Sequence, residues 1–471
     1  MIGGNLMKSN VQRFNQLSKE YYILFMLILL MFRAIGPYSL LPSIVDNLLY
    51  AAGAIFGSII ILIDLVNIVR GKKKWNYNWW LIGFLVVIFI SSIVNRRYGI
   101  TGNIKLLVWQ SIYFLVVYEV AQDNEIFPRL IKKFTGLLTS VWFVLALVSL
   151  IMFFFQYSYT VHLQTRSRFL RIGFYEGRLF GVFEDPNFGS TVCVVVIILS
   201  FAYLVRKSYG NKWLGLLLKI NIILQFLYIV LSGSRTGVLV LISVFFVYSF
   251  FKVFYSKRIN KQHVLVKFLC AILLSLVGCG IIYLSVDLFK WILSYIPELF
   301  NEVKTKNPVK EKPVDLTRPD VENNDDISNG RLALWKSGIE LFKSSWLVGV
   351  SPRNMLPYAS DMLPQTFIAK TQKYTHNSYI NLLASTGSLG VVTFVSFFVS
   401  RIIEIVAFSF SKVNNFFQQG YATYVLSVLA VAVSGMFLND IILVNSIGSL
   451  IFWLFLGRIV YLSKEFNKGI I

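Results

Sequence analysis

Residues 213–255 have the sequence WLGLLLKINIILQFLYIVLSGSRTGVLVLISVFFVYSFFKVFY, in which two apolar runs flank a short polar turn. The runs cover 213–231 and 237–255, about 19 residues each, which is the helix length needed to cross a hydrocarbon core about 30 Å thick. Residues 232–237, which form the turn and the start of the second run, hold two glycines, two serines and a threonine around Arg235. This helical hairpin predicts a membrane protein and excludes a soluble enzyme.

The same pattern recurs along the whole chain, whose 471 residues are 56% hydrophobic and 16% aromatic. We predict an all-α fold: a polytopic membrane protein with about twelve transmembrane helices and one large outer-face loop that contains an amphipathic helix. The predicted spans are 20–36, 48–69, 79–94, 104–121, 134–157, 188–205, 213–231, 237–255, 264–287, 380–400, 421–438 and 442–461.

Basic residues predict the orientation, because short loops rich in Lys and Arg stay in the cytoplasm. Runs such as RGKKK (70–74), RKSYGNK (206–212) and KRINK (257–261) all fall on one side of the predicted spans, the side of the N-terminus. We therefore expect both termini in the cytoplasm and the long loop outside. The net charge of +22 follows from this topology and from contact with anionic lipid, and no nucleic-acid-binding module accompanies it.

Three parts are predicted along the chain. Residues 1–287 form an N-terminal transmembrane bundle of about nine spans with an outer loop at 158–187, residues 288–379 form the large extracytoplasmic loop, and residues 380–471 form the C-terminal transmembrane helices. The polar section 302–330 is expected to be a mobile surface loop.

A helix is predicted after the polar section, capped by Ser328 or Asn329. Its apolar residues recur at helical spacing and predict a single apolar stripe, with the helix lying against the membrane face or against the transmembrane bundle. The stripe consists of Leu332, Trp335, Ile339, Phe342 and Trp346.

The outer loop 158–187 contains four arginines where the charge bias disfavours them. Guanidinium forks suit phosphate or carboxylate oxygens, so these arginines predict an anion-binding site, and a solvated loop is the alternative. They are Arg166, Arg168, Arg171 and Arg178. Asp185 is placed to cap the next helix, and the amide of Asn187 could orient a neighbouring group.

Two further residues are candidates for chemistry at the outer membrane boundary. Arg235 lies in a turn that can expose backbone amides, although an arginine snorkelling from a helix end is the alternative. His376 precedes a predicted span, and its imidazole can accept a proton or, when charged, pair with phosphate. A histidine that only makes interface hydrogen bonds is the alternative. We find no spaced Cys/His set for a metal, and no cofactor is expected.

Taken together, four motifs resemble the bacterial superfamily of O-antigen ligases and Wzy-type polysaccharide polymerases. They are RLFGVFEDPNFGS (178–190), SGSRTG (232–237), GRLALWKSGIELFKSSWLVGV (330–350) and HNSYINLLASTGSLG (376–390). Two departures stand out: Ala384, Ser385 and Thr386 occupy the place where the family often has an acid, and Trp346 and Ser351 replace a Pro and a Gly of the usual loop.

The resemblance implies a metal-independent glycosyltransferase at the outer face of the bacterial cytoplasmic membrane. Its donor is a glycan linked through diphosphate to undecaprenyl lipid, and the hydroxyl of a glycan acceptor attacks the anomeric carbon. By motif position, Arg178 and Arg235 hold the diphosphate and His376 activates or orients the acceptor. The implied substrate-binding residues are Arg166, Arg168, Arg171, Asn187, Arg331 and Asn377.

Three functions remain open at this point. A Wzy-type polymerase that joins repeat units into a surface polysaccharide is the leading hypothesis, with a flippase and a chain-length regulator as expected partners. A ligase that moves finished glycan to another acceptor has the same motifs. A lipid-linked glycan flippase would also need outer arginines, but the sequence lacks the internal repeat typical of many transporters.

Overall fold

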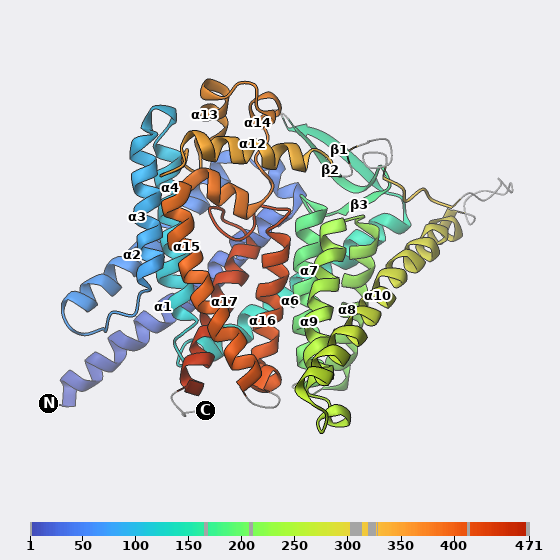
Figure 1. Cartoon of the computed structure of the whole chain (residues 1–471), viewed down its shortest axis with the longest axis horizontal. Coiled ribbons are helices and arrows are strands. Elements are labelled where there is room, and N and C mark those ends of the chain that lie inside the picture. Colours follow the sequence, from blue (N-terminus) through green and yellow to red (C-terminus); the bar gives the residue numbers. More distant parts are fainter. Residues whose placement is uncertain are drawn as a thin grey trace.

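The chain forms a mostly helical bundle in a computed structural model that describes residues 2–163, 168–206, 211–301, 313–318, 326, 328–411 and 415–467. Long helices run between two ends of the bundle (Figure 1). The start of α1 (Ile2–Ala34) and the end of α17 (Ile447–Asn467) lie at one end. Helices α12 (Arg331–Ser344) to α14 (Phe367–Thr371) lie with a small sheet at the opposite end, which we call the loop end.

Helices make up most of the chain. The long or apolar helices are α1 (Ile2–Ala34), α2 (Ser43–Val69), α3 (Trp79–Val94), α4 (Thr101–Ile112) with a π-helical turn (Tyr113–Val117) and α5 (Tyr118–Val120), α6 (Phe127–Phe154), α7 (Pro186–Val205), α8 (Lys212–Leu231), α9 (Arg235–Phe254), α10 (Val264–Asn301), α15 (Ser378–Ser411), α16 (Tyr421–Ser434) and α17 (Ile447–Asn467). Three shorter helices are α12 (Arg331–Ser344), α13 (Met355–Met362) and α14 (Phe367–Thr371).

Every predicted span overlaps one of these helices. Among the described residues, 8 helices are long and apolar enough to cross a membrane, and α3 and α16 are shorter apolar helices. The chain is therefore a polytopic membrane protein, as its composition predicted.

The prediction of an all-α fold missed a sheet in the loop 158–187. Strands β1 (Ser158–Leu163), β2 (Arg168–Tyr175) and β3 (Arg178–Gly181) form an antiparallel sheet in the order β1-β2-β3. Leu170 and Ile172 of β2 are buried against α6. The sheet turns the chain back after α6 and delivers Arg178 to the start of α7.

The large loop differs from its prediction in two respects. Helix α10 continues to Asn301, so the predicted loop boundary at 287/288 lies inside a helix. Residues 313–318 are packed against the protein, with Leu316 only 6% exposed, so the expectation of a mobile surface loop is wrong for this part.

Helix α12 begins close to its predicted start, but it buries another face. Gly330 precedes the helix, and the Ser328 hydroxyl oxygen accepts from the Leu332 N–H at 3.2 Å. The buried residues of α12 are Leu334, Ser337, Gly338 and Leu341. Of the predicted stripe, Leu332, Ile339 and Trp346 are exposed and Trp335 and Phe342 are half-buried. Leu334 and Leu341 belong to an apolar cluster with residues of α13, α14 and α15. A Cβ on Gly338 would lie 2.5 Å from Ile380 Cγ2, so α12 approaches α15 closely at this glycine.

A kink in α15 docks the chain that follows α12. Gly387 adopts φ +62°, which interrupts the helix and frees backbone groups on both sides of it. Residues 346–351 take up these groups: Val350 N–H donates to Ala384 O at 2.9 Å, and Ser388 N–H donates to Trp346 O at 2.7 Å. Residues 346–351 and the kink in α15 therefore cross with their backbones in contact. Only glycine fits at Gly349 and Gly387, because a Cβ there would collide with the other backbone.

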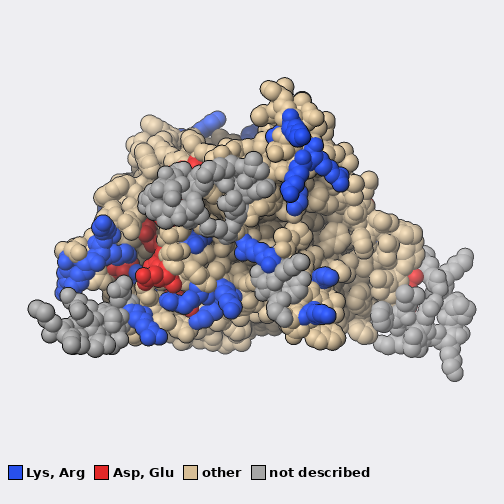
Figure 2. All heavy atoms as spheres, turned by 90° about the horizontal axis from the view of Figure 1, so that it is seen from below, with Lys and Arg blue, Asp and Glu red and all other residues tan. Residues whose placement is uncertain are grey.

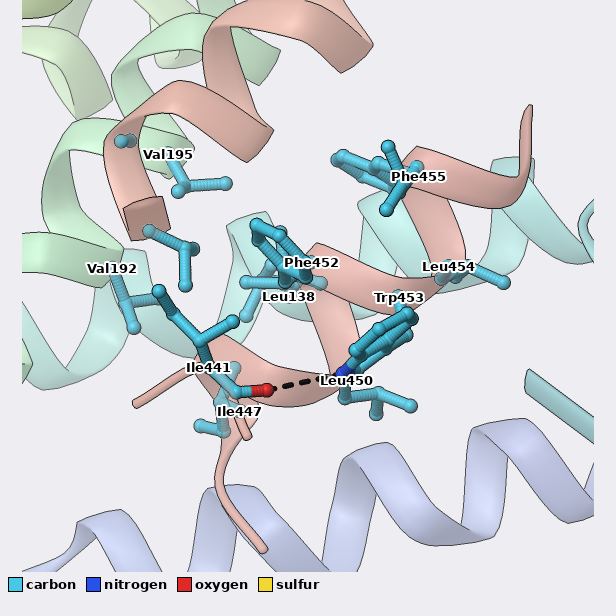
Figure 3. Close-up of a cluster of buried hydrophobic side chains, with 14 of the residues drawn as sticks. Leu138, Val192, Val195, Ile441, Ile447, Leu450, Phe452, Trp453, Leu454 and Phe455 are labelled. Atoms are coloured by element: carbon cyan, nitrogen blue, oxygen red, sulfur yellow. Dashed lines mark hydrogen bonds between the residues drawn. The ribbon is translucent and has the colours of Figure 1, made fainter. Parts of the chain in front are cut away.

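The end of α16 is followed by residues 435–446, which we call the inserted segment. Its residues Ile441 and Ile442 are buried, and the Trp453 indole N–H of α17 donates to Ile441 O at 3.0 Å (Figure 3). Because this non-helical segment replaces helix, the two predicted spans 421–438 and 442–461 are displaced to α16 and α17.

The end of the bundle opposite the loop end is rich in charged residues. Figure 2 shows that face, where lysines and arginines are scattered around one acidic patch. Two buried carboxylates are paired with lysines: Asp64 accepts from Lys19 and Lys73, and Glu20 accepts from Lys133 at 2.7 Å. These ion pairs neutralise the two carboxylates, Glu20 of α1 and Asp64 of α2.

We predict that Gly387→Ala lowers the thermal unfolding midpoint of the purified protein. Gly387 has φ +62° and ψ −164°, a conformation that costs a non-glycine residue about 1–3 kcal/mol, and a Cβ would also lie 2.5 Å from the Leu347 carbonyl carbon. Gly280→Ala is the matched control, because its Cβ meets nothing within 4 Å and alanine favours helix. Equal midpoints for both variants would contradict the docking described.

Candidate functional site

Arg178 begins β3 and points its guanidinium at the turn between α8 and α9. Its Nε donates to Ser232 O at 2.9 Å, and its Nη2 donates to the side-chain oxygen of Asn187 at 3.3 Å. The same Asn187 oxygen accepts from the Ser234 hydroxyl at 2.9 Å. Asn187 therefore orients Arg178, while its contact with substrate stays a prediction.

The turn between α8 and α9 is built from serines and one glycine with a positive φ angle. Ser232 Oγ is 2.9 Å from Ser190 Oγ, which ties the turn to α7. Ser234 caps α9 by accepting from the Gly237 N–H at 3.0 Å. Gly233 adopts φ +59°, a conformation that glycine tolerates best. This geometry exposes Arg235, the first residue of α9, at the loop end.

Arg318 of the large loop reaches the same turn, and the sequence analysis missed it. Its Nη1 donates to Gly233 O at 2.8 Å. A Cβ on Gly233 would lie 3.2 Å from Arg318 Cδ and 3.4 Å from Arg178 Cγ, so the two side chains lie close together over this glycine. No local pattern marks Arg318, because its position depends on residues far away in the sequence.

His376 lies just before α15 with a left-handed backbone, φ +48°. The next residues hold it there. Ser378 N–H donates to Gly435 O at 2.7 Å, and Ser378 Oγ accepts from the Asp440 N–H at 2.9 Å. The inserted segment thus fixes the backbone beside His376, while the imidazole keeps an exposed surface.

Asn377 has a structural task. Its side-chain oxygen accepts from the N–H groups of Tyr379 and Ile380 at 2.9 and 3.0 Å, so it caps α15. This cap explains the asparagine in the motif, and its predicted role in substrate binding remains untested.

Electrostatic interactions connect the histidine with the arginines. The pKa of His376 lies below its ordinary value, mainly because the surrounding protein removes water from the ring; Arg331 and Lys373 lower it further and Asp185 opposes them. Burial and the charges of Arg235 and Arg318 likewise lower the pKa of Arg331.

Negative charge in the site comes from two aspartates. Asp185 caps α7 by accepting from the Asn187 N–H at 2.8 Å, and it raises the pKa values of His376 and Arg331. Asp326 accepts from Ser328 and Gly330, contacts that lower its pKa with a further contribution from Arg235. The resulting site combines several guanidiniums with a neutral imidazole at neutral pH, an arrangement suited to an anion beside a hydroxyl that must lose a proton.

The other arginines of the 158–187 loop differ in how close they lie to Arg178. The Arg171 guanidinium lies 5.7 Å from the centre of the Phe180 ring, and that of Arg178 lies 5.5 Å from the same ring, so Arg171 borders the site. Arg168 starts β2, roughly 23 Å along the strand from Tyr175, which pairs with Arg178. Arg166 lies outside the described residues.

We predict that His376 titrates below its ordinary pKa and that its neighbours shift it in opposite directions. Arg331→Gln removes a positive charge, so the pKa of His376 rises. Asp185→Asn removes a negative charge but keeps the cap acceptor, so that pKa falls. NMR of protein labelled with ¹⁵N-histidine resolves this, because the chain has 3 histidines and His376→Gln identifies the signal.

Arg353→Gln is the control for this titration. Arg353 is an exposed arginine that lies beside Gly102 of α4, so its removal makes the same change of charge at another part of the protein. A His376 pKa that is unchanged by both Arg331→Gln and Asp185→Asn would refute the electrostatic connection.

Residues 220–395 match the family model described as O-antigen ligase. The matched region contains SGSRTG, α12 and the His376 motif, and the motif around Arg178 lies before it. This match confirms the resemblance predicted from the motifs. No curated protein sequence matches the chain significantly.

Proposed function

We propose, from the match of residues 220–395 to the O-antigen ligase family model, that this chain is a Wzy-type polymerase at the outer face of the bacterial cytoplasmic membrane. It transfers a growing glycan from undecaprenyl diphosphate to a hydroxyl of the next lipid-linked repeat unit. The observation that supports this most is the gathering of Arg178, Arg235, Arg331 and His376, from four separate segments, at the loop end.

The arginines fit the leaving group of this reaction. As the glycosidic bond breaks, the diphosphate gains negative charge, and guanidiniums already held in position stabilise that charge without reorganising. In this proposal Arg178 and Arg235 bind the diphosphate, and Arg331 lies between them and His376. No metal ion is required, because the guanidiniums supply the positive charge.

His376 fits the acceptor side. Its lowered pKa keeps the imidazole neutral at neutral pH, so it can accept the proton of the attacking hydroxyl. Both termini are then cytoplasmic, and the flippase and chain-length regulator of the same polysaccharide are its partners.

A ligase that moves completed glycan to another acceptor is the second candidate, since the family model is described as O-antigen ligase. A flippase is less well supported. It needs charges along a path through the bundle, whereas β3 and α12, which begin with Arg178 and Arg331, lie at the loop end (Figure 1).

We predict that Arg178→Ala, Arg235→Ala and His376→Ala each reduce chain elongation by about 100-fold or more, the usual cost of losing one positioned transition-state donor. Arg235→Lys also loses most activity, because an ammonium cannot form the two parallel bonds of a guanidinium. Polymer length in cells and elongation by purified protein measure these effects.

Arg353→Ala is the control with the same change of charge, and it should elongate normally. Each variant must reach the membrane with an unchanged thermal midpoint, which matters most for Arg178 because it also holds the α8–α9 turn. Normal polymer in cells that carry only Arg235→Ala would rule out the diphosphate role.

Purified protein with lipid-linked repeat units alone separates the two leading functions. We expect a ladder of products, each longer by one repeat, because a polymerase uses the repeat unit as both donor and acceptor. A reaction that begins only when a different glycan acceptor is added would instead establish a ligase.

A further inference from the structure

We propose that Arg318 binds the diphosphate of the donor, so that the large outer loop supplies part of the donor site through residues 313–318. This inference rests on the proposed function and adds a residue that the family motifs do not include. It follows from how the segment is anchored, where its guanidinium lies and which charges surround it.

The segment 313–318 is held from both sides. Val314 N–H donates to Ser294 O of α10 at 2.9 Å, and Leu316 is buried in the main hydrophobic core. On the other side, a Cβ on Gly177 would lie 1.8 Å from Thr317 O, so the segment touches the backbone of the β2–β3 turn. Gly177 has φ +68°, which suits glycine at this close approach.

This anchoring leaves little freedom to the side chain that follows. The bond from Arg318 Nη1 to Gly233 O and the contact with Arg178 place its guanidinium over the turn that also presents Arg235. Arg318 is half-buried at this contact, and its charge is close enough to lower the pKa of Arg331.

Four guanidiniums at close quarters repel one another, and the repulsion is stronger where protein displaces water. A ligand with two or more negative charges relieves it. A diphosphate diester carries two charges spread over adjacent phosphates, which matches several guanidinium forks better than a single carboxylate does. The donor class already proposed for this site therefore accounts for an arginine contributed by the loop.

Donor kinetics of the purified enzyme test this inference, with inorganic pyrophosphate as a competing probe. We expect Arg318→Ala to raise the donor KM and the pyrophosphate inhibition constant about tenfold each, while the acceptor KM stays unchanged. Arg318→Lys should lie between Arg318→Ala and wild type. Leu316→Ala, which loosens the segment without removing a charge, should raise the donor KM less, and Arg353→Ala should change neither constant.

The outcomes distinguish this inference from the proposed function. If the enzyme elongates glycan but Arg318→Ala leaves both the donor KM and the pyrophosphate inhibition constant at wild-type values, the inference is wrong and the function stands. If wild-type protein does not elongate, its thermal stabilisation by pyrophosphate is measured. A stabilisation lost in Arg318→Ala supports the anion site, and one equal in both proteins overturns it.

Discussion

The carbonyl oxygens of the turn between α8 and α9 hold the guanidiniums on which the site depends. Ser232 O accepts from Arg178 at 2.9 Å and Gly233 O accepts from Arg318 at 2.8 Å. Hydrogen bonds to charged groups contribute about 1.5–3 kcal/mol each, so they offset part of the repulsion between the two arginines. Because the turn requires φ +59° at Gly233, its backbone shape decides where the positive charge lies.

A second, separate device places His376. The kink at Gly387 docks the chain after α12, and Ser378 fastens the start of α15 to the inserted segment. These contacts involve α15 and the segments that follow α12 and α16. The turn between α8 and α9, by contrast, is tied to α7. The part of the site that holds the arginines and the part that holds His376 are thus built by different helices. Arg331, at the start of α12, connects the two parts through its charge.

The sequence predicted whatever depends on neighbours along the chain. Span positions follow from runs of apolar residues, and the cap by Asp185 follows from the proline after it. It missed what depends on distant contacts. The sheet was overlooked because Phe169 is exposed and breaks the alternation of a half-buried strand. Arg318 was overlooked because its segment is polar, and only contacts with Gly177 and Gly233 order it.

Ser351 shows how local chemistry replaces a missing motif residue. It has φ +72° at the position where the motif that this loop resembles has glycine, and it is fully buried. Its hydroxyl donates to Ser91 O at 2.7 Å, and its N–H donates to Ser385 O at 3.0 Å. These two bonds offset a backbone strain of about 1–2 kcal/mol, so the loop keeps its course after α12.

In the proposed reaction, charge couples the two halves of the site. Arg331 lowers the pKa of His376 when no donor is bound. A diphosphate beside Arg331 opposes this effect, and the added negative charge on the leaving diphosphate opposes it further. The imidazole therefore becomes more basic in the same step in which the acceptor hydroxyl loses its proton. An interaction that strengthens as the bond breaks lowers the barrier, whereas equally strong binding of substrate would not.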